Sequence, residues 1–390
     1  MAQAISSDMK IDDIISRFKI MLNEDLEIDR VLFYKREETW ELILKTNCPD
    51  SVIEKIDVER DLSPLTDITF VSTSQNNGLQ EFDIIIPVIQ NNVQLAYILI
   101  ADTKEQAKGV SSTIKHLNFV QTLSIIILVA IENLRLFHQT LEQEAIKKEL
   151  ELASKMQSLL IPSQDSLPQS KTLTIQSYYR PHLEVGGDFY DVIQLSKDEI
   201  GFCIADVSGK GISAALLMSN FQANLRALFT HDITLTGLIE RLNERVMSTA
   251  KGERFITIFI GRYNLNRKSL EYVNAGHNPP IMYNATSGNL TMLTEGCVGL
   301  GMLDDIPVMN VGSTRITEHS KLFCYTDGLV ELAKDDKVEF GTQIIEEAIS
   351  NPQSIKENID YLVNFQLFKD GTKDIGIFDD VSIIAFEVFP

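Results

Sequence analysis

The chain has 390 residues, of which 44% are hydrophobic, and its formal net charge is −20. This length accommodates about two or three domains with full cores, and the acidic balance argues against a nucleic-acid-binding face. The four cysteines are scattered without CxxC spacing, which favours a reducing compartment over a disulfide framework and makes a zinc site improbable.

The N-terminal third has the pattern of a small α/β domain. Residues 8–24 place apolar side chains at helical spacing, and residues 29–45 contain two strand-like runs around a charged turn. A second strand pair is predicted over 82–89 and 93–101, with Pro87 indicating an edge or a bulge.

The most apolar run of the chain, Leu123–Ile131, is expected to form a buried helix. Its nine residues are too few for a hydrocarbon layer that needs about 20. The N-terminus lacks the apolar segment of a cleavable signal. We therefore expect a soluble, cytoplasmic protein without a membrane span.

The segment IIIPVIQNNVQLAYILIAD resembles the closing strand pair of GAF-type sensor domains. The resemblance implies a GAF-like sensor domain over residues 1–132, with a possible sensor ligand or activating protein as its input. Ala96 stands where that family commonly has glycine, and the pattern shows no nucleotide- or chromophore-binding signature. A PAS-like domain or a merely structural α/β domain stays open.

A linker helix is predicted over residues 133–162, ending at Pro162. Apolar residues recur there at steps of three or four, with charged residues between them: Leu134, Phe137, Leu141, Ala145, Leu152, Met156 and Leu159. Such steps favour a two-stranded coiled coil and hence a homodimer. The alternative is a single amphipathic helix lying on its own domain.

Residues 163–390 are predicted to form one α+β domain. Strands are expected at 189–195, 200–205, 254–263, 269–274 and 321–326, and helices at 211–230 and 236–251. Several strand pairs with only two central helices imply antiparallel sheets with helices packed outside.

Acidic residues stand at strand boundaries throughout this domain, close to glycines that permit near approach of the backbone. They are Asp188 after Gly186 and Gly187, Asp206 shortly before Gly209, Asp327 before Gly328, and the pair Asp379 and Asp380 before the last strand. Oxygen ligands of this kind suit a hard divalent cation. For any one of them a capped turn is the simpler interpretation, but the recurrence predicts convergence on a metal centre.

The motifs GGDFYD, ADVSGKG, NAGHNPP, YTDGLVE and DDVSII, in this order, resemble the bacterial PPM-type (PP2C-like) serine/threonine phosphatases of the SpoIIE/RsbU group. The resemblance spans about residues 150–388 and implies an α-β-β-α sandwich of two antiparallel sheets with two Mn²⁺ or Mg²⁺ ions. It also implies a role in partner switching, with a phosphorylated STAS-type anti-sigma-factor antagonist as the protein substrate.

When the family's metal-site roles are assigned to the matching motifs, the resemblance implies that Asp188 bridges both metals and that Gly187 approaches one of them. Asp327 and Asp379 would complete one ion's ligands, and these two with Asp188 form the expected catalytic set. Asp380 and Asp206 are further metal candidates, Asp380 as a supporting neighbour and Asp206 as either a ligand or a residue that positions a helix. Glu184 is an additional candidate ligand, and Arg180 lies where eukaryotic members carry a phosphate-binding arginine.

Two divalent ions would activate a water molecule that attacks phosphorus, without a phosphoenzyme. His277 is interpreted as fixing the turn before Pro279 and Pro280, with proton donation to the leaving group as the alternative.

Two other functions are weighed against the phosphatase. The GGDF motif is similar to the GGDEF motif of nucleotide cyclases, and a catalytically inactive binding module is a further alternative. A kinase is disfavoured, since no Gly-rich ATP loop or HRD-like segment is present.

Overall fold

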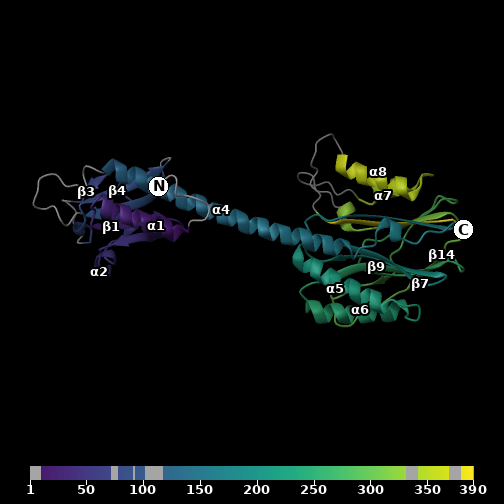
Figure 1. Cartoon of the computed structure of the whole chain (residues 1–390). Coiled ribbons are helices and arrows are strands. Elements are labelled where there is room, and N and C mark those ends of the chain that lie inside the picture. Colours follow the sequence, from purple (N-terminus) through teal and green to yellow (C-terminus); the bar gives the residue numbers. More distant parts are fainter. Residues whose placement is uncertain are drawn as a thin grey trace, which may run out of the picture. The chain divides into compact units, whose positions relative to one another are not determined.

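The computed structural model describes residues 10–71, 78–90, 93–101, 117–330, 341–368 and 379–389. The chain divides into two compact units, Met1–Ala145 and Ile146–Pro390 (Figure 1). The boundary between the units falls within one long helix, and each unit is described by itself below.

The N-terminal unit is built on one antiparallel sheet with the strand order β2-β1-β5-β4-β3. Its elements are α1 (Ile11–Ile20), the π-helical turn η1 (Met21–Asp25), β1 (Arg30–Arg36), β2 (Trp40–Thr46), α2 (Asp50–Ile53), η2 (Val58–Leu62), β3 (Thr69–Phe70), η4 (Leu79–Glu81), β4 (Ile84–Gln90) and β5 (Val93–Ala101). One face of the sheet packs on α1 and the first part of helix α4, and the other face packs on α2 and η2. Both predicted strand pairs are confirmed.

Pro87 lies in β4 beyond the two residues that pair with β3, namely Ile84 and Ile85. It lies opposite Tyr97 of β5, and a bulge follows between Val88 and Ile89. The expectation of an edge or bulge at this proline is confirmed, because a ring nitrogen without a hydrogen cannot donate to a sheet.

Helix α4 runs from Leu117 to Ser158. By length and composition it could cross a membrane, and 44% of its most apolar 18-residue window is buried within the protein. Its first part contributes Val120, Leu123, Ile127 and Ile131 to the N-terminal core. The predicted buried helix is confirmed.

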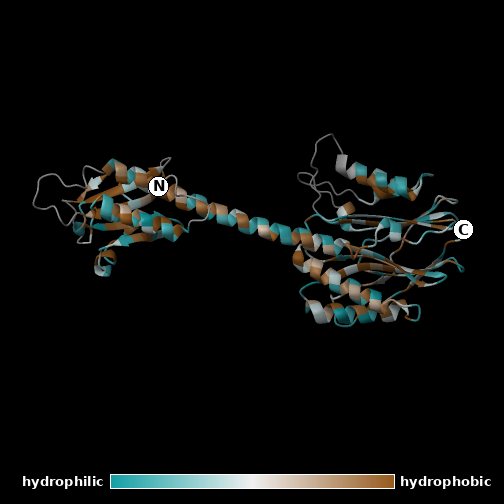
Figure 2. Cartoon of the chain, viewed as in Figure 1, coloured by the Kyte–Doolittle hydropathy of each residue, from teal (hydrophilic) through white to brown (hydrophobic). Residues whose placement is uncertain are grey.

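Leu134 also belongs to that core, whereas the later residues of the predicted apolar stripe are exposed. Hydrophobic residues, brown in Figure 2, recur along the whole helix. The exposed members are Phe137, Leu141, Leu152, Met156 and Leu159. Leu134 was predicted to begin the apolar stripe of the linker, but it packs in the core of the N-terminal unit.

After the end of α4, the described residues of the C-terminal unit form two sheets and four α-helices. Its elements after α4 are η5 (Gln164–Ser166), β6 (Leu173–Arg180), β7 (Phe189–Ser196), β8 (Glu199–Val207), α5 (Ile212–Leu228), α6 (Leu235–Ala250), β9 (Ile256–Asn264), β10 (Ser269–Ala275), β11 (Ile281–Asn284), β12 (Leu290–Met292), β13 (Gly296–Cys297), β14 (Gly312–Arg315), β15 (Ser320–Tyr325), η6 (Asp327–Leu329), α7 (Gln343–Ile349), α8 (Ile355–Phe368) and β16 (Val381–Val388).

These elements form an α-β-β-α sandwich, as predicted. One sheet has the order β13-β10-β9-β8-β7 with β14 beside β10, and the other has the order β12-β11-β15-β16-β6. Figure 1 shows α5 and α6 on one side of the sheets and α7 and α8 on the other. Three apolar cores fill the spaces between successive layers, which is why strands such as β8 and β16 are buried on both faces.

Candidate active site

The pairing of β7 with β8 brings two of the predicted carboxylates to one end of their sheet. Phe189 lies opposite Ala205 in this antiparallel pair. Asp188 directly precedes Phe189 and Asp206 directly follows Ala205. Because the strands are antiparallel, Asp188 and Asp206 lie opposite each other at the same end of the sheet.

The facing sheet delivers the other carboxylates in the same way. Tyr325 of β15 lies opposite Ile383 of β16, and Asp327 follows the first strand while Asp379 and Asp380 precede the second. The two sheets meet at this end, because the Thr326 hydroxyl donates a hydrogen bond of 2.7 Å to Oδ2 of Asp188. Carboxylates far apart in sequence thus gather in one region.

Glycines at this end permit the close approach of the motifs. A Cβ on Gly186 would lie 2.5 Å from Oδ2 of Asp380, and a Cβ on Gly328 would lie 2.1 Å from the carbonyl oxygen of Asp380. Neither distance is tolerated between real atoms, so the GGD, TDG and DD motifs pack together only without side chains at these two positions.

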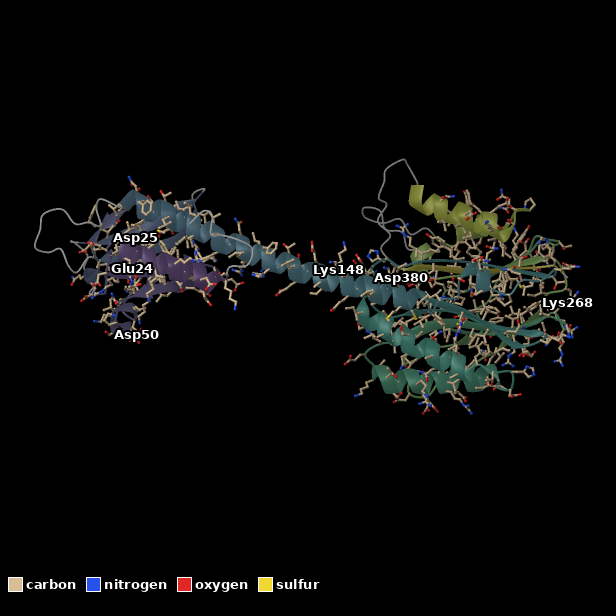
Figure 3. The ribbon with its side chains drawn as sticks, in the orientation of Figure 1. Glu24, Asp25, Asp50, Lys148, Lys268 and Asp380 are labelled. Atoms are coloured by element: carbon tan, nitrogen blue, oxygen red, sulfur yellow. The ribbon has the colours of Figure 1, made fainter. Side chains whose placement is uncertain are left out.

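Asp380 holds the backbone of the GGD loop. Its Oδ1 accepts the N–H of His182 at 2.7 Å, and its Oδ2 accepts the N–H groups of Gly187 at 2.6 Å and Asp188 at 3.4 Å. Figure 3 labels Asp380 at the end of the sandwich where α4 finishes. Both oxygens of this carboxylate are thus engaged with backbone donors.

Burial and mutual repulsion raise the pKa values of the central carboxyls. Asp188 is 1% exposed, and desolvation, followed by the charges of Asp206 and Asp380, raises its pKa well above the ordinary value. Desolvation, followed by the charges of Asp327, Asp379 and Asp380, raises the pKa of Asp206 to about 7. A site that holds carboxylates against such repulsion favours a bound cation.

One cationic side chain already lies in this acidic region. The ammonium of Lys210, from the SGKG turn, is 2.8 Å from Oδ2 of Asp379, and this contact is the largest cause of a raised Lys210 pKa. Among the residues that the structure describes, no three Asp, Glu, His or Cys side chains are gathered closely enough to hold a metal ion. The carboxylate oxygens at this site are suitable ligands for a divalent cation. Their described positions are too far apart to complete the coordination of one.

His277 lies deep in its loop and makes structural hydrogen bonds. Its backbone N–H donates to Oδ1 of Asn274 at 2.8 Å, and Nδ1 is 2.9 Å from the hydroxyl of Thr257. Burial lowers the pKa of His277 to about 4, so the imidazole is neutral near pH 7. These contacts support the interpretation that His277 fixes the turn.

The remaining sequence candidates lie on the surface. Glu184 and Arg180 are exposed, and Arg180 lies opposite Val381, directly after the DD pair. Three residues with contacts at the site were missed by the sequence analysis: Thr326, Lys210 and Gln157. The first two stand inside quoted motifs and could have been found there, whereas nothing in the helical periodicity singles out Gln157.

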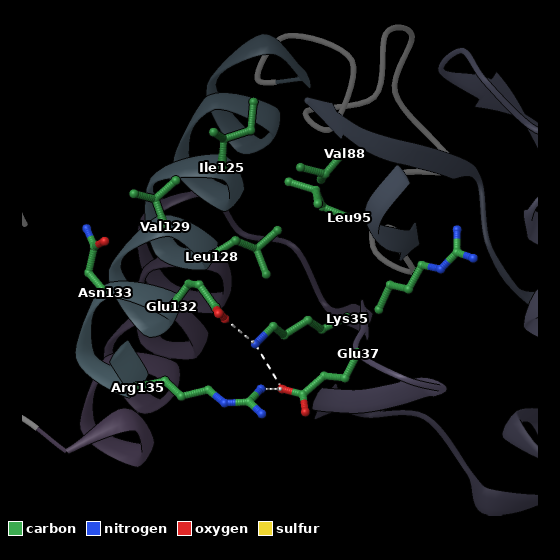
Figure 4. Close-up of a pocket in the computed structure, with 11 residues that line it drawn as sticks. Lys35, Glu37, Val88, Leu95, Ile125, Leu128, Val129, Glu132, Asn133 and Arg135 are labelled. Carbon is green, nitrogen blue, oxygen red and sulfur yellow. Dashed lines mark hydrogen bonds and ion pairs between the residues drawn. The ribbon is translucent and has the colours of Figure 1, made fainter. Parts of the chain in front are cut away.

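The N-terminal unit contains a cavity of about 450 Å³. It lies between α4 and the strands β1, β4 and β5, and its apolar wall includes Val88, Leu95, Leu128 and Val129 (Figure 4). The ammonium of Lys35 lies at its rim, 3.0 Å from Glu37 and 3.2 Å from Glu132. This cavity has no part in the acidic site of the C-terminal unit.

The C-terminal part of the chain is similar to known proteins in sequence and in fold. Residues 196–389 match the family model described as stage II sporulation protein E (SpoIIE). This segment includes Asp206, Asp327, Asp379 and Asp380, whereas Asp188 and Glu184 precede it. The SiaA-PP2C domain of Pseudomonas aeruginosa has a similar fold, with a TM-score of 0.54 at 18% identity, over 63% of this chain and 98% of that domain.

Two curated relatives come from Bacillus subtilis (strain 168). Phosphoserine phosphatase RsbU is 28% identical over 255 residues, which are 64% of this chain and 73% of RsbU. Phosphoserine phosphatase RsbP is 30% identical over 191 residues, which are 47% of this chain and 46% of RsbP. Residues 196–389 of this chain belong to the SpoIIE family of PP2C-type phosphatases.

Proposed function

We propose that this protein is a metal-dependent protein serine/threonine phosphatase that hydrolyses a phosphoserine or phosphothreonine protein. The observation that carries this proposal is the gathering of Asp188, Asp206, Asp327 and Asp379 at one end of the facing sheets, with Asp188 buried and its pKa raised. The names of the relatives RsbU and RsbP support the phosphoserine specificity.

We assign the metal-holding role to the carboxylates of Asp188, Asp206, Asp327 and Asp379 and to the backbone of Gly187. Two Mn²⁺ or Mg²⁺ ions, when bound, supply a water of lowered pKa and offset phosphoryl charge. Asp380 serves as a positioning residue, because both of its oxygens already accept backbone hydrogen bonds. Outer contacts of this kind orient the residues that bind a metal directly.

The chain's own residues prepare the site for an anionic substrate. The Thr326 hydroxyl hydrogen-bonds to Asp188 and favours its ionised form. Lys210 is about half exposed beside Asp379, so its ammonium can turn from that carboxylate toward a phosphoryl group. No Cys or Ser nucleophile is required for hydrolysis by a metal-activated water.

The proposed substrate is a phosphorylated STAS-type anti-sigma-factor antagonist, which places the protein in partner switching in the cytoplasm. The family resemblance supports this, together with the relationship to RsbU. A purified STAS-domain phosphoprotein should lose phosphate faster than an unrelated phosphoserine peptide. Equal rates on both would argue against a dedicated STAS substrate.

The N-terminal unit is proposed as a GAF-like sensor domain (residues 1–132), followed by the linker (133–162) and the phosphatase domain (163–390). Its cavity is within the size range of small-molecule sites and is the candidate place for a sensor ligand. The exposed apolar residues of α4 from Phe137 to Met156 support a homodimer through the linker. Leu152→Glu should shift a dimer to monomer in sedimentation analysis.

The decisive experiment is a phosphatase assay with and without Mn²⁺. Asp188→Asn and Asp327→Asn should each reduce metal-dependent hydrolysis by about 100-fold or more, since several kcal/mol of metal-derived stabilisation would be lost. Both variants should keep the circular dichroism spectrum of the parent. Near-normal rates in either variant would contradict the assignment.

The same assay tests the two alternatives. A folded parent protein without Mn²⁺-dependent hydrolysis would favour an inactive binding module. Metal-dependent consumption of GTP would favour a nucleotide cyclase, although the α-β-β-α sandwich and the SpoIIE match support the phosphatase.

A further inference from the structure

The last turn of α4 makes a two-point contact with the GGD loop. The side-chain amide of Gln157 donates from Nε2 to the carbonyl oxygen of Gly186 at 2.6 Å. Its Oε1 accepts the N–H of the same glycine at 3.1 Å. Gln157 is 7% exposed, although the residues on either side of it, Met156 and Ser158, are exposed. This side-chain amide therefore holds the two peptide groups that flank Gly186, one through its N–H and the other through its carbonyl oxygen.

The loop is held from the opposite side by Asp380. Gly186 is followed by Gly187, whose N–H donates to Oδ2 of Asp380 at 2.6 Å. A side chain at position 186 would collide with that same oxygen. The peptides leading into Asp188 therefore lie between an amide from the helix and a carboxylate from the DD motif.

The segment that follows α4 is tied to the same part of the domain. The carbonyl oxygen of Pro162 accepts the hydroxyl of Tyr190 at 2.9 Å, and Tyr190 lies two residues after Asp188. The carbonyl oxygen of Leu160 accepts the amide of Gln222, from α5, at 3.5 Å. The end of the helix and the segment after it therefore contact the chain on both sides of Asp188, at Gly186 and at Tyr190.

We propose that Gln157 is a positioning residue for the metal centre, through which the last turn of α4 sets the direction of the Asp188 carboxylate. This inference rests on the proposed function, because the direction of Asp188 has a consequence only where Asp188 binds metal. Loss of the donor at Nε2 would free the Gly186 carbonyl and loosen the peptide before Asp188. Removal of such a supporting contact typically weakens metal binding by about 10- to 100-fold.

The test compares Gln157→Met and Gln157→Glu with the parent. Methionine keeps the length of the side chain and removes both hydrogen bonds, whereas glutamate keeps an acceptor for the Gly186 N–H and removes the donor. Gln143→Glu is the matched control, because Gln143 is an exposed glutamine on the same helix. Mn²⁺ binding is read from the electron paramagnetic resonance signal of free Mn²⁺, with no substrate present.

We expect Mn²⁺ affinity to fall about tenfold in both Gln157 variants and to stay at the parent value in the control. The Mn²⁺ concentration for half-maximal turnover should rise by the same factor, while the rate at saturating Mn²⁺ returns close to that of the parent. A merely structural role would lower the fraction of active protein at every Mn²⁺ concentration instead. Parent-like Mn²⁺ affinity in folded Gln157 variants would overturn the inference and leave the proposed function standing.

Two further outcomes are distinguishable. If the full-length parent binds no Mn²⁺, the proposed function fails and the inference fails with it. If the Gln157 variants do not fold, amide hydrogen exchange measured on the parent protein still tests the inference. The Gly186 N–H should be strongly protected, and exchange at the rate of an exposed amide would show that Gln157 does not hold the loop.

Discussion

Thr326 and Asp188 come from different sheets and are joined by a hydrogen bond of 2.7 Å. Thr326 follows β15 and Asp188 precedes β7, so this contact closes the sandwich at the acidic end. The same threonine hydroxyl accepts the N–H of Ser382 at 2.9 Å. One hydroxyl therefore connects the TDG, DD and GGD segments.

Thr326→Val removes this hydroxyl while keeping the shape of the side chain. The Asp188 carboxylate would lose a donor that favours its ionised form, so its pKa should rise further and Mn²⁺ affinity should fall about tenfold. The free energy of unfolding of the metal-free protein should fall by about 1 kcal/mol. Isothermal titration with Mn²⁺ and urea denaturation measure the two effects. Thr326→Ser, which keeps the hydroxyl, is the control and should bind Mn²⁺ like the parent.

Mn²⁺ affinity should increase as the pH rises through about 7, because the raised pKa of Asp206 makes a proton compete with the metal. The stability of the metal-free protein should change in the opposite direction. A folded-state pKa above the unfolded value of about 3.9 gives stability that is present at acid pH and is lost as the pH rises through about 7.

Asp206→Asn should flatten both profiles. Melting temperatures without metal, measured between pH 4 and 8, and Mn²⁺ titrations at pH 6 and 8 provide the comparison. An unchanged pH profile in this variant would show that Asp206 is not the titrating group.

His277 should contribute a pH dependence of the opposite sign. Its folded-state pKa of about 4 lies below the unfolded value, so the unfolded chain takes up a proton first and stability is lost as the pH falls from about 6.5 toward 4. The full effect is about 3 kcal/mol. The difference in unfolding free energy between the parent and His277→Asn, measured across this range, isolates it from the carboxyl groups.

Turnover at pH 7.5 gives a separate check on His277. A turn-fixing residue predicts that folded His277→Asn keeps most of its maximal rate. A loss of two or more orders of magnitude in a folded variant would instead support proton donation by the imidazole.

Arg226→Met should destabilise the C-terminal domain by about 2 kcal/mol. The guanidinium of Arg226, on α5, donates two hydrogen bonds to Asp191, at 2.7 Å from Nε and 2.8 Å from Nη2. Asp191 is fully buried while the arginine is about half exposed. The substitution therefore leaves a buried carboxylate without its positively charged partner and without two of its hydrogen bonds. Urea denaturation measures the loss, and Arg245→Met, at an exposed position of α6, should have little effect.

Much of this protein could be predicted from its sequence. The alternating and helical patterns gave the strand pairs, α5, α6 and the long helix, because each element must present an apolar face to its neighbours. Glycines next to Asp188 and Asp327 marked the segments where motifs pack closely, since no side chain is tolerated there. The ordered motifs then indicated the phosphatase family before any fold was known.

Only the tertiary structure decided how those residues contact each other. Strand register places Asp188 beside Asp206, and the stacking of the two sheets brings Thr326 to Asp188. Periodicity assigned Leu134 to the helix stripe but could not show that it packs in the N-terminal core, because both environments require an apolar residue. Gln157 carries no signal in the sequence, since a polar residue on a helix is usually exposed and its burial depends on a loop about 30 residues away.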